Sequence, residues 1–116
     1  MTLRELAVKL EGEILTPDVN LDTEVPCAFS SDLISDILMC TKESTLLLTG
    51  LTNPQVIRLS DMIDLVGIIF VRGKKPNAEL IEMAVERGLP LISTSNTMYM
   101  SSGILYHAGL RSCKIK

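Results

Sequence analysis

Short apolar runs along this chain each end in a small polar cluster, and an amphipathic segment follows each cluster. Four of these runs are predicted as strands: residues 25–29, 45–48, 66–71 and 90–92. The third contains Ile68-Ile69-Phe70-Val71, which is apolar on both faces, as a central strand of a parallel sheet is. Strand and helix alternate about every 20–25 residues, which is typical of crossover units. The pattern therefore predicts a three-layer α/β/α fold with a mainly parallel sheet.

Capping residues predict where the helices begin and end. Thr2 is expected to cap the first helix, with Glu5 completing a capping box and Gly12 ending the helix. Gly88 and Gly109 are expected to end the last two helices. The N-caps predicted for the later helices are Ser30 or Ser31, Asn53, Asn77 and Thr97.

No low-complexity linker divides the chain, and its 116 residues suffice for one core. We therefore expect a single domain over residues 1–116, with a core at 2–110 and a C-terminal tail at 111–116. Residues 13–15 and the segment 110–116 are candidate edge strands.

The composition of the chain argues against several classes of function. The net charge of -3 and the 3% aromatic content argue against nucleic-acid binding. No apolar run approaches the roughly 18–20 residues that span a bilayer, and the first residues lack a signal-peptide pattern. These features predict a cytoplasmic protein that does not enter a membrane. A mean hydropathy of +0.32 with six methionines leaves aliphatic surface to cover, which predicts a homodimer.

The predicted turns place polar residues at the carboxyl ends of the strands, where open parallel sheets bind ligands. Helix N-termini there favour anions, and Arg72, Lys74 and Lys75 add positive charge. We therefore predict a small anionic ligand, phosphorylated or a nucleotide, at this edge. The alternative is that the polar residues only cap helices while the basic ones are solvated. The candidate ligand-binding residues are Asn53, Arg72, Lys74, Ser93, Thr94, Asn96 and Thr97.

No catalytic, metal or cofactor site is expected. The glycines form neither a dinucleotide fingerprint nor a P-loop. Cys27, Cys40 and Cys113 lack metal-binding spacing, and His107 is the only histidine. Cys27 and Cys40 are interpreted as packing residues, and Cys113 as an exposed, modestly activated thiol in the tail. All three are expected to stay reduced in the cytoplasm.

Four segments resemble the DRTGG-domain family: residues 31–38 (SDLISDIL), 46–49, 66–73 and 88–93. The resemblance extends over roughly residues 2–110. It implies a fold similar to the N-terminal domain of HPr kinase/phosphorylase, without the kinase activity of that enzyme's separate domain. The chain departs from the motif that names the family, because residues 50–52 read Gly-Leu-Thr in place of Gly-Asp-Arg.

The resemblance implies a non-catalytic regulatory domain that senses a ligand or mediates assembly. An alternative is an accessory protein of an iron-hydrogenase-like or iron–sulfur redox system, acting through contacts with a redox protein partner.

Overall fold

In the computed structural model, which describes residues 1–39 and 43–115, a six-stranded sheet has the order β1-β5-β4-β3-β2-β6. The strands are β1 (Glu13–Ile14), β2 (Cys27–Ser30), β3 (Thr45–Thr49), β4 (Leu65–Phe70), β5 (Leu91–Ser93) and β6 (Arg111–Ser112). The helices are α1 (Leu3–Lys9), α2 (Ile34–Ile37), α3 (Pro54–Arg58), the 3-10 turn η1 (Leu59–Asp61), α4 (Ala78–Glu86) and α5 (Met98–His107). The predicted α/β fold with a mainly parallel sheet is confirmed.

All strand pairs are parallel except the one between β1 and β5. Both predicted edge strands form: β1 lies beside β5, and β6 from the C-terminal tail lies beside β2. Every residue of β3 is buried, as its central position requires. No helix among the described residues is long and apolar enough to cross a bilayer.

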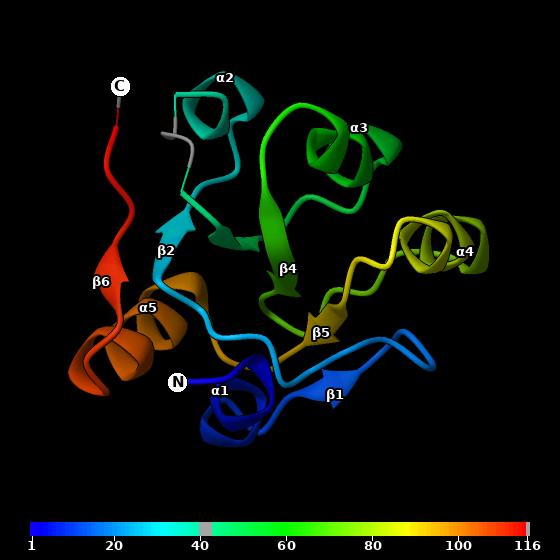
Figure 1. The fold of residues 1–116 in the computed structure, drawn as a ribbon. Helices are drawn as coiled ribbons and strands as arrows, with labels where there is room; N and C mark the ends of the chain where they lie inside the picture. Colours follow the sequence, from blue (N-terminus) through cyan, green and yellow to red (C-terminus); the bar gives the residue numbers. More distant parts are fainter. Residues whose placement is uncertain (40–42, 116) are drawn as a thin grey trace.

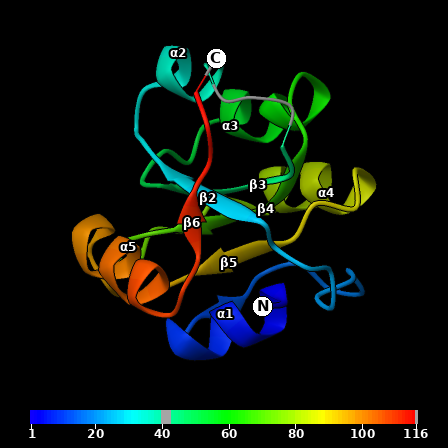
Figure 2. The same ribbon diagram turned by 60° about the vertical axis from the view of Figure 1, so that its left-hand side comes forward.

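The sheet separates two apolar layers (Figure 1 and Figure 2). On one face, α1 and α5 pack against a core that includes Leu6, Leu46 and Leu105. On the other face, α2, α3 and α4 pack against a core that includes Ile57 and Phe70. Because neighbouring side chains of a strand point to opposite faces, Leu46 and Leu48 belong to the first core and Leu47 to the second.

Most predicted caps are present. Thr2 and Glu5 form the reciprocal capping box of α1. Asn53, Asn77 and Thr97 each accept a hydrogen bond from the third backbone N–H that follows them. These contacts depend on sequence neighbours alone, which is why the pattern predicts them.

Two expected boundaries are wrong. Neither Ser30 nor Ser31 caps α2; its N-cap is Leu33, whose side chain makes no capping bond. Ser31 Oγ instead accepts the Leu33 N–H at 3.0 Å, forming a turn ahead of a four-residue helix. Gly12 does not end α1. The helix ends at Lys9 with Leu10 as its C-cap, and the residue that takes the left-handed conformation after it is Glu11, with φ 52°. A glycine is needed at position 12 because the backbone there packs closely against β5: an added Cβ would lie 2.6 Å from Cγ2 of Ile92.

Candidate functional site

The polar residues at the end of β5 and just after it bond to backbone carbonyls of other segments. Ser93 Oγ donates to the Lys74 carbonyl at 2.9 Å. Thr94 Oγ1 donates to the Leu10 carbonyl at 2.8 Å, and Asn96 Nδ2 donates to the same oxygen at 3.3 Å. Ser93 and Thr94 are both buried. Their hydroxyls therefore satisfy backbone groups at the end of α1 and in the turn after β4.

The other two uncharged candidates lie at helix N-termini. Asn53 Oδ1 accepts the Val56 N–H, and Thr97 Oγ1 accepts the Met100 N–H, each at 3.2 Å. Capping thus accounts for the side chains of Asn53 and Thr97, as the alternative interpretation of these residues supposed.

The basic candidates Arg72 and Lys74 are exposed. Arg72 has a left-handed backbone, with φ 58°, and donates its N–H to the Asn96 carbonyl at 2.8 Å. The turn after β4 is therefore hydrogen-bonded to the loop that leads into α5. Both segments are predicted from the sequence to lie at the carboxyl ends of their strands, and this contact agrees with that placement. Lys75, by contrast, extends to Glu13 of β1, with an Nζ–Oε1 distance of 2.8 Å.

Asp32 belongs to the same edge, although it is not among the predicted site residues. Its Oδ1 accepts the Thr49 hydroxyl at 3.0 Å and the Gly50 N–H at 2.6 Å. The Arg72 guanidinium lies over Gly50 too, because a Cβ on that glycine would be 2.5 Å from Nη2. Asp32 comes two residues after the end of β2 and lies in the segment 31–38, and these are the sequence signals for its role. One anionic and one cationic group thus flank the turn after β3.

A groove of about 480 Å³ lies between α5 and the strands β2 and β6. Two exposed tyrosines of α5, Tyr99 and Tyr106, belong to its lining, and these residues are 88% and 74% exposed. The hydroxyls of Ser30 and Ser102, both in its lining, are hydrogen-bonded at 2.8 Å. Its lining is Ala28, Phe29, Ser30, Leu48, Tyr99, Ser102, Gly103, Leu105, Tyr106, Leu110, Arg111 and Ser112. No sequence pattern indicated this groove, because its walls come from distant segments.

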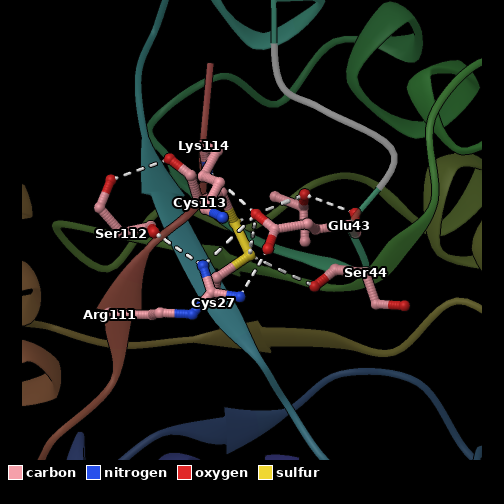
Figure 3. A network of polar contacts seen from close by, with 8 residues as sticks. Cys27, Glu43, Ser44, Arg111, Ser112, Cys113 and Lys114 are labelled. Atoms are coloured by element: carbon pink, nitrogen blue, oxygen red, sulfur yellow. Dashed lines mark hydrogen bonds and ion pairs between the residues drawn. A yellow bond between two sulfur atoms is a disulfide. The ribbon is translucent and has the colours of Figure 1, made fainter. Parts of the chain in front are cut away.

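The expected state of two cysteines is wrong, because Cys27 and Cys113 form a disulfide (Figure 3). Cys113 is buried, not an exposed thiol, and Cys27 is buried as well. The parallel pairing of β6 with β2 joins them across a sequence separation of 86. Disulfides are uncommon in the cytosol, so the cysteines no longer support a reducing compartment. Cys40 lies outside the described residues.

Glu43 lies beside this disulfide and contacts residues of the C-terminal tail (Figure 3). Its carboxylate pairs with the Arg111 guanidinium and accepts the Lys114 N–H at 3.0 Å. Glu43 Oε2 lies 3.8 Å from Cys27 Sγ. Hydrogen bonding to Glu43 raises the pKa of Arg111 above its usual value. Strand β6 is thus fastened by a covalent bond and by an ion pair.

No protein-family model matches the chain, and no curated protein sequence matches it. A solved structure does: the CBS and DRTGG domains of the regulatory region of Clostridium perfringens pyrophosphatase, complexed with its activator, diadenosine tetraphosphate. The two are 15% identical, with a TM-score of 0.67 over 90% of this chain and 45% of that one. The fold is DRTGG-like. With 45% of that structure covered, this chain spans about half the length of the regulatory region that it matches.

Proposed function

We propose that this chain is a regulatory module that binds a small anionic ligand of the nucleotide class. The regulatory region that shares its fold was solved with a nucleotide activator, diadenosine tetraphosphate. That region is regulatory, not catalytic, which supports a non-catalytic role here. The resemblance to the N-terminal domain of HPr kinase/phosphorylase stays a prediction.

The groove beside α5 is the observation that carries the proposal. Its volume of about 480 Å³ is typical of small-molecule sites, which are mostly apolar with a few polar groups. Tyr99 and Tyr106 offer exposed rings on which a base could stack, a contact worth about 1–3 kcal/mol per base. Arg111 also belongs to the groove lining, and its guanidinium pairs with Glu43 at the far end of β6's contact with β2.

The carboxyl edge of the sheet is the second part of the proposal. Of the seven predicted residues, only Arg72 and Lys74 carry charge. Neither pairs with a carboxylate within the part of the chain that the structure describes. We propose them as phosphate contacts, with Asn53, Ser93, Thr94, Asn96 and Thr97 shaping the loops around them.

A thermal-shift titration tests the binding. The probes are diadenosine tetraphosphate, ATP, AMP and inorganic pyrophosphate, which separates recognition of the base from recognition of phosphate. A ligand at about 100 times its Kd should stabilise the fold by about 2.7 kcal/mol. Absence of a shift with all four probes contradicts the proposal.

Three variants locate the site. Tyr106→Ala should weaken binding of the nucleotides but not of pyrophosphate, because only the nucleotides carry a base. Arg72→Ala combined with Lys74→Ala should weaken both. Met62→Ala is the matched control, since Met62 is 64% exposed and lies outside the groove lining. Equal affinities in all variants would place the ligand elsewhere.

The dimer stays a prediction as well. Tyr99, Met100 and Tyr106 give α5 an exposed apolar side that a second copy could cover. Sedimentation at micromolar concentration measures the oligomeric state directly. The accessory role in a redox or hydrogenase system receives no support from the comparisons, and we do not propose it.

A further inference from the structure

Three side chains beside β6 carry metal-ligating atoms that face one another. Cys27 comes from β2, Glu43 from the segment before β3, and Cys113 follows β6 (Figure 3). One ligand atom from each residue lies within 4.8 Å of the other two. Both cysteines are buried and Glu43 is half-buried, so the cluster is largely shielded from bulk water.

The chemistry of the cluster favours zinc over hard cations. Thiolates select zinc and other thiophilic metals, whereas magnesium and calcium take oxygen ligands. Two thiolates and one carboxylate carry three negative charges. One divalent cation together with the Arg111 guanidinium, which pairs with Glu43, would balance that charge within the site.

Contacts from the C-terminal tail orient the Glu43 carboxylate. Arg111 and the Lys114 N–H hold the carboxylate in place. Such outer contacts orient metal ligands, and their loss typically weakens metal affinity about 10–100-fold.

We propose that reduced Cys27 and Cys113, together with Glu43, bind one zinc ion and leave a fourth position for water. The disulfide must open first. A dithiol transfers two electrons and two protons to the S–S bond, giving two cysteine thiols while the dithiol closes to its own disulfide. Zinc then binds the two thiolates, and their two protons pass to solvent. The same pair of cysteines would hold β6 to β2 in either state.

Cobalt(II) is the spectroscopic probe, because tetrahedral thiolate coordination gives it visible and near-ultraviolet absorption bands. The background protein carries Cys40→Ser, so that only Cys27 and Cys113 contribute thiols. It is reduced with a phosphine, which competes little for the metal, and its fold is checked by circular dichroism. We expect one cobalt ion per chain in the reduced protein, displaced by zinc, and none in the oxidised protein.

Variants identify the ligands. Cys27→Ser and Cys113→Ser should each abolish the thiolate bands that two sulfurs give. Glu43→Gln keeps the shape and both thiols but removes the charged ligand, and should weaken zinc binding at least as much as loss of an outer contact, which costs about tenfold or more. Glu24→Gln is the matched control, because Glu24 pairs with the N-terminus and is not a member of the cluster.

Two results overturn the proposal. One is a reduced, folded background protein that shows no thiolate bands with cobalt. The other is Glu43→Gln binding zinc as tightly as the control, which would remove the carboxylate from the site. If a cysteine variant fails to fold, Glu43→Gln and the oxidised protein still decide the question. Nucleotide binding plays no part in this readout, so its outcome is separate from that of the proposed function.

Discussion

Reducing the Cys27–Cys113 disulfide in the absence of metal should lower the stability of the domain markedly. The bond closes a sequence separation of 86, which is most of the chain. In the chain-entropy model, a loop of that length corresponds to about 4.6 kcal/mol at 25 °C, and measured losses are typically about 2–4 kcal/mol. Because a domain of this size loses about 4 °C in Tm for each kcal/mol, we expect a fall on the order of 10 °C.

The reduced protein should nevertheless remain folded. Without the disulfide, β6 keeps its pairing with β2, the Cys113 N–H bond to the Ala28 carbonyl at 2.9 Å, and the pair between Arg111 and Glu43. Both cores lie mainly outside this contact. The loss should therefore appear as a lower midpoint of cooperative unfolding, not as loss of the fold.

Urea unfolding followed by circular dichroism measures the effect, with and without a phosphine reductant and with a chelator present throughout. Mass spectrometry of alkylated samples confirms that the thiols are free. A variant with Cys27→Ser and Cys113→Ser is the control, since its midpoint should not respond to reductant. Equal midpoints for the oxidised and the fully reduced protein would refute the reasoning.

Three further substitutions test contacts in the fold. Gly12→Ala should cost about 1–3 kcal/mol in urea unfolding, since its Cβ would meet a buried side chain of β5 at 2.6 Å. Gly50→Ala should cost under about 1 kcal/mol, because its Cβ meets the exposed end of Arg72, which can move away; equal costs would contradict this contrast. Hydrogen bonding to Arg87 lowers the pKa of Asp61 in the folded state. The pair therefore stabilises the fold at pH values above the pKa that Asp61 has in the unfolded chain. This contribution is lost as pH falls through the lower pKa that Asp61 has in the folded protein. Asp61→Asn should therefore flatten the decline of stability below about pH 4, and an unchanged slope in that variant would exclude a contribution from the pair.

The features that the sequence predicted correctly depend on local interactions. The capping box of Thr2 with Glu5, and the caps at Asn77 and Thr97, join residues three positions apart. Gly88 takes a left-handed backbone immediately after α4, as its place at the end of an apolar period indicated. Parallel pairing also followed from alternation alone, because consecutive parallel strands require crossovers.

The features that the sequence did not predict depend on long-range register. The hydroxyl of Thr94 could serve a ligand or the protein, and only the fold shows that the Leu10 carbonyl accepts from it. Cys27 and Cys113 carry no recognisable spacing, since their meeting follows from the pairing of β6 with β2. In both cases the contact depends on which distant segment of the chain lies next to the residue. The type of side chain alone does not give that information.

Strand β6 joins the two regions for which we propose functions. Arg111 and Ser112 line the groove beside α5, and Cys113, the next residue, forms the disulfide with β2. Arg111 also pairs with Glu43, so a change in the charge of the cluster acts on a side chain in the groove lining. The nucleotide titration should therefore be run on oxidised, reduced and zinc-loaded protein. A difference in nucleotide affinity among the three states would show that β6 couples the groove to the cysteines. Equal affinities would show that the disulfide serves stability alone as far as this ligand is concerned.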